Sequence, residues 1–487
     1  MKSSRLVWIS SFVAACASQA PAPPPAAPAA TSAPPKVAVA PSASKTATVE
    51  EQETLQHWLE RKVPAGGRVE RAADGTMHVY AARKSGQSTA KLAHDYLQLT
   101  EYYEAPTLAR ALEKSAGTAK GKTELEIPRL VRAAIPDDPE KERLPKVEEG
   151  GLRGVFITGS YAQVRWIETL DKVAAHGLNA VVLDGKDYEG GVNYPSKAKI
   201  AVETKASGPK PFIPDLTRAI RMAHNRGIRI ILRIPAFHDP WSSKRAPRIS
   251  VQGTWGQPFP MGWLDPQNEE AHQYIVELAE EGIAAGADEI QLDYVRFPVH
   301  HGTEKAVFVE AKDGARMTVI RDFVRKVHER TKAHGVPLSL DIFGVTATGT
   351  YQKDLEMLGQ DIAVLAPEAE VLSPMVYPSH YTPGFMGFAQ PGDHPEILGI
   401  ATKAAVAKLP KGSTTVIRQW LQAFPDRSPH FGAEYVKTEA RLAEEHGGVG
   451  WLLWAPSCNY WAAWQAWPAR EPQAQGGSPR ASAGAAP

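Results

Sequence analysis

From residue 151 to about residue 467, short apolar runs rich in β-branched residues alternate with longer amphipathic stretches. The short runs predict buried strands, and the amphipathic stretches, which mostly end at glycine, predict helices that pack against them. Regular alternation of this kind predicts parallel βα units. The expected strands are 154–159, 180–186, 229–237, 289–298, 337–344, 371–378, 414–424 and 448–456. Eight such units predict a (β/α)8 TIM barrel over residues 151–467.

The competing fold for this pattern is an open, doubly wound sheet, which needs a glycine-rich phosphate turn after its first strand. The sequence at that point reads GSYAQ, from Gly159 to Gln163, and does not provide such a turn. The sequence therefore favours the closed barrel.

A smaller unit with its own pattern precedes the barrel, at residues 50–132. An amphipathic helix is followed by a strand, two helices and a closing strand, so the unit contains the order βααβ. This order, with Ile-Pro in the last strand, resembles a LysM domain, and the resemblance implies binding of N-acetylglucosamine polymers. The Gly-Asp-Thr that usually follows the first strand is replaced here by SGQST at 85–89. A generic βααβ packing domain without a ligand therefore stays open.

The fourth expected strand, EIQLDYVRFP at 289–298, carries an aspartate inside an apolar run. Alternate residues of a barrel strand point to the interior, so Asp293 is expected inside. Ile290, Leu292 and Tyr294 are expected to face the helices. Because burying an unpaired carboxylate costs several kcal/mol, Asp293 requires a partner or a function.

The same alternation points Asp184, Arg233 and Asp341 inward from the second, third and fifth strands. Three aspartates and one arginine would then cluster at the carboxyl ends of strands two to five. One interpretation is a structural Asp–Arg network that holds the strands together. We favour a catalytic site, because the carboxyl-terminal rim is where barrel enzymes keep their reactive groups.

Aromatic residues gather in and after the carboxyl ends of the expected strands. Sugars present flat C–H faces that stack on such rings, and hydroxyl groups that bond to charged side chains. A glycan cleft is therefore expected at this rim. The expected substrate contacts are Asp184, Lys186, Arg233, Arg296, Tyr377, Trp420 and Trp454.

Glycoside hydrolysis needs two carboxyl groups. One protonates the leaving oxygen, and the other attacks the anomeric carbon or activates water. Asp293 and Asp341 lie at equivalent depth on neighbouring strands, which are about 4.8 Å apart in a sheet. We therefore expect these two residues as the catalytic pair, in a close arrangement of the retaining type. Arg233 or Arg296 would keep the nucleophile ionised.

Five segments resemble a bacterial family of glycoside hydrolase barrels that was long described as a domain of unknown function. The resemblance implies a (β/α)8 fold, a glycosidase-type activity and Asp293 as the catalytic carboxylate. It leaves the partner of Asp293 open, with Asp341 as the first choice and Asp184 as the second. The segments are NAVVLDGKDYEGGVNYPS (179–196), MGWLDPQN (261–268), EIQLDYVRFP (289–298), LSLDIFG (338–344) and LSPMVYPSHY (372–381).

Two other functions stay open. A metal-dependent polysaccharide deacetylase needs an aspartate with two histidines, and His224, His238, His300 and His301 lie near strands three and four. Neither a His-x-x-x-His spacing nor HExxH occurs, so we expect no metal and no cofactor. The other alternative is a non-catalytic glycan-binding lipoprotein with a degenerate barrel.

The first residues predict a bacterial export signal. Lys2 and Arg5 precede a short apolar stretch that ends in VAAC, which resembles a lipobox with Cys16 as the lipidated residue. A plain signal peptide cut near ASQA is the alternative. We expect a lipoprotein signal at 1–16, a disordered Ala/Pro-rich linker at 17–49, a second linker at 133–150 and a disordered tail at 468–487.

The net charge of +1 over 487 residues gives no reason to expect a nucleic-acid partner. The two cysteines, Cys16 and Cys458, lie at opposite ends of the chain, so no disulfide is expected. The sequence thus predicts an exported cell-envelope lipoprotein that meets the membrane through its lipid anchor alone. In a Gram-negative host we expect the outer membrane or the periplasmic face, with polysaccharide or peptidoglycan as the substrate.

Overall fold

The structure is a computed structural model. Cys16, His300, His301, the expected signal at 1–16, nearly all of the expected linkers at 17–49 and 133–150, and the expected tail from residue 470 onward lie outside the residues that it describes. The described residues are 49–73, 75–83, 87–102, 105–118, 124–130, 143–144, 151–260, 262–299, 303–308, 312–349 and 352–469.

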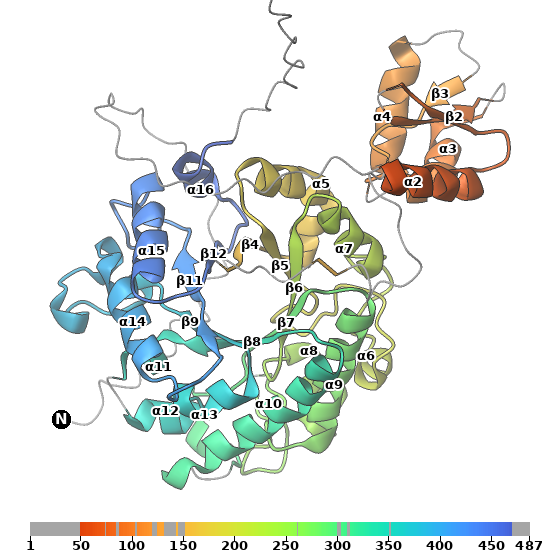
Figure 1. The fold of residues 1–487 in the computed structure, drawn as a ribbon. Helices are drawn as coiled ribbons and strands as arrows, with labels where there is room; N and C mark the ends of the chain where they lie inside the picture. The colour runs from red at the N-terminus through yellow and green to blue at the C-terminus, as the bar shows by residue number, and fades with distance from the viewer. Residues whose placement is uncertain are drawn as a thin grey trace, which may run out of the picture.

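Parallel strands form a closed ring in which β4 pairs with β12 at one side and β8 pairs with β9 at the other (Figure 1). Two short segments, β10 and β11, both pair with β9 and together make one barrel strand. The prediction of a (β/α)8 TIM barrel is therefore confirmed. The strands are β4 Arg153–Ile157, β5 Ala180–Asp184, β6 Arg229–Pro235, β7 Glu289–Asp293, β8 Leu338–Phe343, β9 Val371–Met375, β10 Val416–Ile417, β11 Gln419–Gln422 and β12 Trp451–Trp454.

The strands are shorter than the apolar runs that predict them. The seventh, expected as one strand at 414–424, is interrupted at Arg418, although the Arg418 backbone N–H still donates to Leu372 O at 2.9 Å. The fourth ends at Asp293 because Tyr294 takes a left-handed backbone conformation, with φ at 50°. Residues beyond Asp293 do not follow strand alternation.

Helices surround the ring (Figure 1), and several of them begin at polar caps. Thr158, Asp215, Asn268 and Asp361 each accept a hydrogen bond from the first turn of the helix that follows. The barrel helices are α5 Gly159–Ala175, α6 Lys199–Thr204, α7 Leu216–His224, α8 Pro240–Arg245, α9 Glu269–Ala284, α10 Ala315–Ala333, α11 Gly344–Thr348, α12 Gln352–Leu358, α13 Ile362–Leu365, α14 Glu396–Ala407, α15 Ala433–Glu445 and α16 Trp461–Ala466. Short 3-10 turns lie at Leu97–Leu99, Pro247–Ile249, Thr303–Lys305, Lys312–Gly314, Ala366–Glu368, Pro378–His380, Phe385–Gly387 and Pro391–Asp393.

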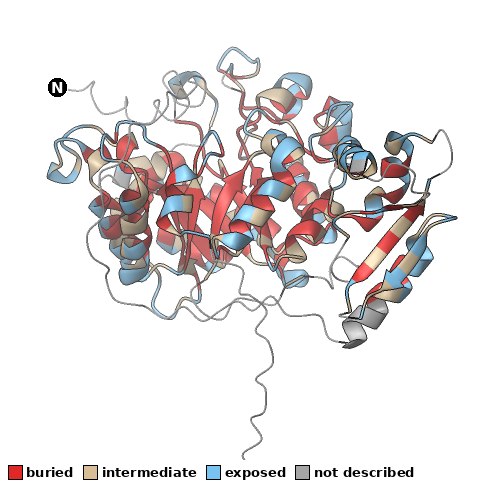
Figure 2. Cartoon of the chain, turned by 90° about the horizontal axis from the view of Figure 1, so that it is seen from above, coloured by how far each residue is buried: buried red, intermediate tan, exposed pale blue. Residues whose placement is uncertain are grey.

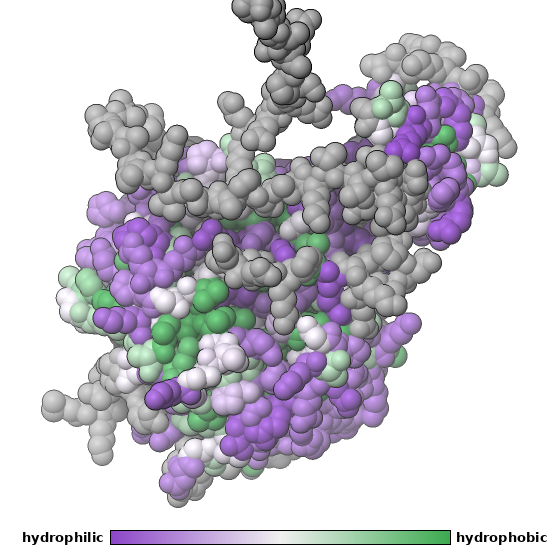
Figure 3. All heavy atoms as spheres, viewed as in Figure 1, coloured by the Kyte–Doolittle hydropathy of each residue, from purple (hydrophilic) through white to green (hydrophobic). Residues whose placement is uncertain are grey.

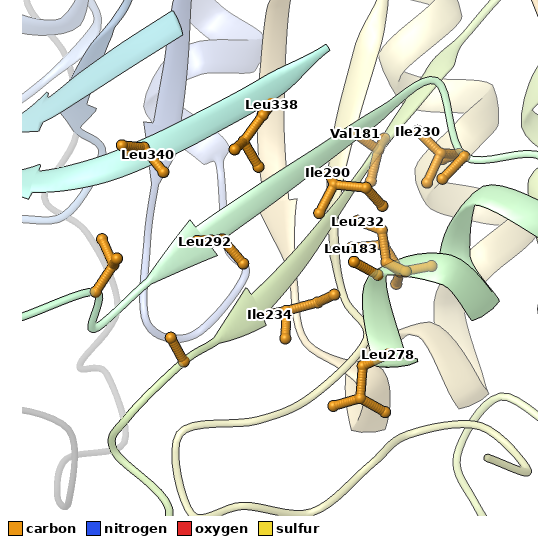
Figure 4. Close-up of a cluster of buried hydrophobic side chains, with 14 of the residues drawn as sticks. Val181, Leu183, Ile230, Leu232, Ile234, Leu278, Ile290, Leu292, Leu338 and Leu340 are labelled. Atoms are coloured by element: carbon orange, nitrogen blue, oxygen red, sulfur yellow. The ribbon is translucent and has the colours of Figure 1, made fainter. Parts of the chain in front are cut away.

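The core has two layers, on the two faces of the strands. Outward side chains such as Leu232, Ile290 and Leu292 pack against the helices in one large apolar cluster (Figure 4). Inward side chains such as Val182 and Ile231 form a separate, smaller apolar cluster. Buried residues accordingly fill the strands, and exposed residues lie on the outer helix faces (Figure 2). The alternation expected from the sequence is therefore confirmed for these strands.

A three-stranded antiparallel sheet forms a separate unit near the amino terminus, in the order β1-β2-β3. The expected strand–helix–helix–strand order appears as β2, α3, α4 and β3, and β1 adds a third strand that the sequence did not predict. Leu59, Val79 and Leu108 lie at the centre of its own core. The elements are α2 Val49–Lys62, β1 Arg68–Arg71, β2 Met77–Ala82, α3 Thr89–Tyr96, α4 Ala105–Thr118 and β3 Glu124–Glu126.

Arginines of the barrel attach this unit to α7 and its surroundings. Arg226 bonds to Glu101 at 2.7 Å and to Asp171 at 2.9 Å, and Arg218 donates to Thr100 O and Tyr102 O at 2.9 and 2.7 Å.

The viewed face of the molecule is mainly hydrophilic, with hydrophobic side chains gathered near its middle (Figure 3). Over the described residues, no helix combines the length and the hydropathy needed to cross a bilayer.

Candidate active site at the carboxyl ends of the strands

One arginine lies among three carboxylates inside the barrel. Arg233 of β6 pairs in register with Asp184, the last residue of β5, and β7 on its other side ends at Asp293. Arg233 Nη1 donates to Asp184 Oδ1 at 2.5 Å, and Nη2 donates to Asp293 Oδ2 at 2.6 Å. Its Nε lies 3.8 Å from Asp341 Oδ2 of β8. The structure thus brings together all four inward residues expected from strand alternation.

Asp293 is fixed by its own backbone as well as by the arginine. The N–H of Tyr294 donates to Asp293 Oδ1 at 2.6 Å, so both carboxylate oxygens accept a hydrogen bond. The left-handed φ of Tyr294 is uncommon for a residue with a side chain, and such conformations cluster at functional sites. The Tyr294 ring packs on His238 at a centroid distance of 4.9 Å, which agrees with its exclusion from the substrate contacts.

Asp341 is the most deeply buried of the three carboxyl groups, with a side chain that is 1% exposed. Its Oδ1 accepts a hydrogen bond from Trp420 Nε1 at 2.6 Å, and its Oδ2 accepts none from the described residues. Burial, and then the neighbouring charge of Asp293, raise the pKa of Asp341 well above its usual range. Burial therefore favours the protonated form of Asp341 more than it would be favoured in an exposed aspartate.

Asp184 has an intermediate character. Burial raises its pKa to about 7, although the attraction of Arg233 acts in the opposite direction. Its backbone carbonyl accepts a hydrogen bond from the Asn193 side chain at 2.9 Å, which anchors the end of β5. Arg233 therefore links Asp184 to Asp293. The pKa of Asp184 lies close to neutral pH.

Two of the expected substrate contacts are enclosed by protein. The Lys186 side chain is fully buried, and its ammonium group donates to Pro235 O at 2.8 Å and lies 3.2 Å from Asp239 Oδ2. Arg296 is buried over the rings of Trp263 and Phe343, and burial lowers its pKa to about 10. Both residues follow the ends of their strands, where alternation fails. The structure thus places both cations against protein groups, and their expected role as substrate contacts stays a prediction.

The expected aromatic contacts divide into two kinds. Tyr377 and Trp454 stack on each other, with centroids 5.0 Å apart and planes at 27°, and Phe424 meets Trp454 edge-on at 5.2 Å. Trp454 keeps part of its surface exposed. Trp420 is buried and acts as the hydrogen-bond donor to Asp341, a role that the sequence reasoning missed. Strand alternation indicates that Trp420, like Arg418, points inward, but it does not identify Asp341 as the partner.

The histidines considered for a metal lie at different places. His224 precedes β6 and bonds to Asp288 at 2.8 Å, whereas His238 follows β6 and bonds to Tyr188 O at 2.6 Å. The seven residues of β6 lie between these two histidines and span roughly 23 Å at the usual rise of a strand, so the two rings are at opposite ends of the strand. Within the described ranges, no group of three or more His, Cys, Asp or Glu side chains is arranged to hold a metal ion.

A closed barrel with a buried carboxylate cluster at the carboxyl ends of its strands defines this part of the chain as a barrel enzyme domain. Residues 154–460 match the family DUF4015, which is described as "Putative glycosyl hydrolase domain". The chain belongs to this family, and the resemblance seen in its sequence is confirmed. The barrel is accordingly a glycan-acting hydrolase domain.

Three solved structures share a distant likeness to the chain. A hypothetical protein from Ruminiclostridium thermocellum has 28% sequence identity over 38% of this chain and 96% of its own, with a TM-score of 0.35. The spore cortex-lytic enzyme SleL of Bacillus megaterium has 12% identity over 79% of this chain and 85% of its own, with a TM-score of 0.41. The catalytic domain of β-amylase from Paenibacillus polymyxa has 11% identity over 66% and 99%, with a TM-score of 0.43. No curated protein matches the chain.

Proposed function

We propose that the barrel hydrolyses glycosidic bonds of a polysaccharide or cell-wall glycan, with Asp293 as nucleophile and Asp341 as general acid. The observation that carries the proposal is the unequal environment of two carboxyl groups on adjacent strands. Asp293 accepts hydrogen bonds from Arg233 and from the Tyr294 N–H, and these bonds hold both oxygens of its carboxyl group in place. Burial raises the pKa of Asp341 and favours its protonated form. Two carboxyl groups whose environments differ in this way suit one base or nucleophile and one acid.

The register of the strands supports a retaining mechanism. Leu292 of β7 pairs with Leu340 of β8, so Asp293 falls opposite Asp341 one position further on. Adjacent strands lie about 4.8 Å apart. Retaining enzymes hold their two carboxyl groups about 5–5.5 Å apart, whereas inverting enzymes leave room for a water between them.

The reaction then proceeds in two steps. Asp341 gives its proton to the glycosidic oxygen while an Asp293 oxygen attacks the anomeric carbon. The bond to the leaving sugar breaks, and a glycosyl ester forms on Asp293. In the second step Asp341, now ionised, takes a proton from water, and the water oxygen attacks the anomeric carbon. The ester bond breaks, which restores ionised Asp293 and protonated Asp341.

The neighbouring residues serve this pair. Arg233 holds the Asp293 carboxylate and is itself held by Asp184, which makes Asp184 a positioning residue. Trp420 engages one oxygen of Asp341 and leaves Oδ2 for the proton that is transferred. Tyr377 supports the partly exposed ring of Trp454, on which a sugar can stack.

A trapping experiment tests the proposal. The purified full-length protein is incubated with peptidoglycan and with a panel of polysaccharides, and released reducing ends are measured. Wild type should release sugar, Asp293→Asn should not, and a 2-fluoro glycoside should leave an adduct on the peptide that contains Asp293. Glycan binding without turnover on any substrate would refute hydrolysis and favour the non-catalytic glycan-binding alternative. Activity lost with a chelator would favour the deacetylase.

We also infer that the protein is exported and lipidated at Cys16. The inference is supported by the positive residues Lys2 and Arg5, the short apolar stretch and the VAAC that follows it. Metabolic labelling with a palmitate analogue should mark wild type, and Cys16→Ser should lose both the label and the membrane fraction. If the wild-type protein takes up no label, the lipidation proposal fails and the export signal is a plain signal peptide. Glycan binding by the unit at 50–132 stays a prediction from its resemblance to LysM domains.

A further inference from the structure

The long segment between β6 and α9 folds into a ribbon at the carboxyl end of the barrel. Isolated bridges pair His238 with Trp263 and Gln252 with Pro258, so the segment runs outward and returns beside itself. A further bridge pairs Gly253 with Ala306, in the segment that follows β7. The ribbon therefore stands on the same rim as Asp293, the last residue of β7.

A tight turn forms the tip of this ribbon. Gly256 N–H donates to Gly253 O at 2.9 Å, and Gly253 N–H donates to Gln257 O at 2.8 Å. Gly256 has a φ of +73°, which side chains rarely adopt, so glycine is required there. Thr254 N–H donates to Lys305 O at 2.8 Å and joins the turn to the neighbouring segment. The backbone of the tip is thus fixed from two sides.

Trp255 is displayed on this turn. A Cβ placed on Gly253 would lie 2.4 Å from Cζ2 of the Trp255 ring, so the indole lies directly against the bare glycine backbone. Phe259 lies beside it, with centroids 6.4 Å apart and planes at 29°. The residue nevertheless stays 50% exposed. The turn therefore presents one face of the indole to solvent above a supported backbone.

We propose that Trp255 is a second sugar-binding position, away from the catalytic carboxylates, that stacks on one pyranose unit of a polymeric glycan. The proposal rests on the proposed glycan hydrolysis and adds to it a contact that only a long substrate can reach. A pyranose offers a flat face of C–H groups that matches the electron-rich face of an indole. Because Gly253 supports the ring and the bond from Thr254 to Lys305 holds the turn, binding costs little side-chain entropy.

The test separates binding from turnover. All variants are made in the Asp293→Asn background of the full-length protein, and binding is measured by native gel retardation in soluble polysaccharides and by pull-down on peptidoglycan, chitin and cellulose. Trp255→Ala should weaken binding to the preferred polymer about threefold to tenfold, the range expected for one lost stacking contact. Trp255→Phe should keep most of the affinity. Ile400→Ala, which trims a residue 45% exposed on α14, is the matched control and should change nothing.

Kinetics on the parent with an intact Asp293 give a second readout. Trp255→Ala should raise KM for the polymer and leave kcat and KM for a short chromogenic glycoside unchanged, with an unaltered Tm. Equal polymer binding by the Asp293→Asn protein with and without Trp255→Ala overturns the proposal, and so does an Asp293→Asn protein that binds none of the polymers. If no variant hydrolyses any glycan but Trp255→Ala still binds more weakly, the sugar-binding position stands and the proposed hydrolysis fails.

Discussion

Strand β7 carries an acidic residue at each end of its inward face, and the two ends differ in how each charge is balanced. Glu289, the first residue, meets Arg418 across the barrel in a two-pronged ion pair whose side chains are 4% and 3% exposed. Asp293, the last residue, shares Arg233 with two further carboxyl groups, Asp184 and Asp341. One end has one cation for each anion, and the other has one cation for three carboxyl groups.

The difference in charge balance assigns a structural role to one end of β7 and a catalytic role to the other. A matched and fully bonded buried pair leaves no charge unsatisfied, which is what a core tolerates. A surplus of carboxyl groups raises the pKa of some of them, and that cost is useful only where protons must be transferred. We infer that the Glu289 end maintains the barrel and that the Asp293 end performs the chemistry.

Replacing Asp293 gives the largest expected effect. Asp293→Asn keeps the shape of the side chain but removes the nucleophilic oxygen charge, so kcat should fall by at least about a thousandfold. Stability should hold or rise, because one of three crowded carboxylates is neutralised. Reducing-end release and a thermal melt of the same preparation measure the two effects. An active Asp293→Asn enzyme would remove this residue from the reaction.

Breaking the Glu289–Arg418 ion pair at the other end of β7 should lower stability and leave activity nearly unchanged. Glu289→Ala leaves Arg418 buried without its partner, and such changes cost about 3–5 kcal/mol in the free energy of unfolding. The activity of the molecules that remain folded should be close to wild type. Urea denaturation and active-site titration with the trapping glycoside separate the two quantities.

A double variant provides the control for this pair. Glu289→Leu with Arg418→Met removes both charges, and replacing a buried ion pair by apolar residues is often neutral or stabilising. The double variant should therefore regain most of the lost stability. If Glu289→Ala abolishes catalysis in fully folded protein, the division between the two ends of β7 is wrong.

The sequence predicts the fold and the inward carboxylates well because both depend on local periodicity. Asp184, Asp293 and Asp341 lie within strands, where a period of two sets the direction of each side chain. Lys186 and Arg296 lie beyond the strand ends, where turns such as the left-handed Tyr294 set the direction instead. No short-range pattern encodes those turns, so strand alternation could not place either cation.

The role of Trp420 could not be read from its strand alone. Its bond to Asp341 joins residues 79 positions apart, on strands β8 and β11 that are separated by β9 in the closed ring. Alternation shows that Trp420 points inward, but its partner depends on how the ring closes. Long-range contacts of this kind form only in the assembled barrel, so strand alternation predicted an aromatic substrate contact where the structure has a hydrogen-bond donor.

Trp420→Phe should change kcat less than Asp293→Asn does, and its pH profile tests whether Asp341 is the general acid. Phenylalanine keeps an aromatic ring but removes the N–H that favours ionised Asp341, so the pKa of Asp341 should rise further. The basic limb of the kcat profile should move to higher pH, and kcat at its optimum should fall about tenfold, the cost of one charged hydrogen bond. The full pH profile is measured for wild type and variant.

A matched aromatic change at a distance serves as the control. Trp461→Phe on α16 alters a residue that is 41% exposed, and it should leave the pH profile in place. If the basic limb stays fixed in Trp420→Phe while activity falls, Trp420 only packs against the site. In that case another group, with Asp184 as the next choice, supplies the proton.

The smallest expected effect concerns the pH dependence of stability. The pKa of Asp184 is about 7 in the folded protein and about 3.9 in an unfolded chain, so the folded state binds more protons between these values. The stability contributed by this group is complete below pH 4 and is lost as the pH rises through 7. Relative to wild type, Asp184→Asn should therefore gain on the order of 1–2 kcal/mol between pH 5 and pH 8. Urea denaturation at both values measures this difference.

Arg233 makes the sign of that result informative. If Asp184 were instead held ionised by the arginine, its folded pKa would lie below the unfolded value, and wild-type stability would fall toward acid pH. Asp184→Asn would then lose stability relative to wild type at both pH values, with no gain between them. That outcome would make Asp184–Arg233 a second matched pair like Glu289–Arg418. Asp293 and Asp341 would remain as the only carboxyl groups that share the surplus of charge.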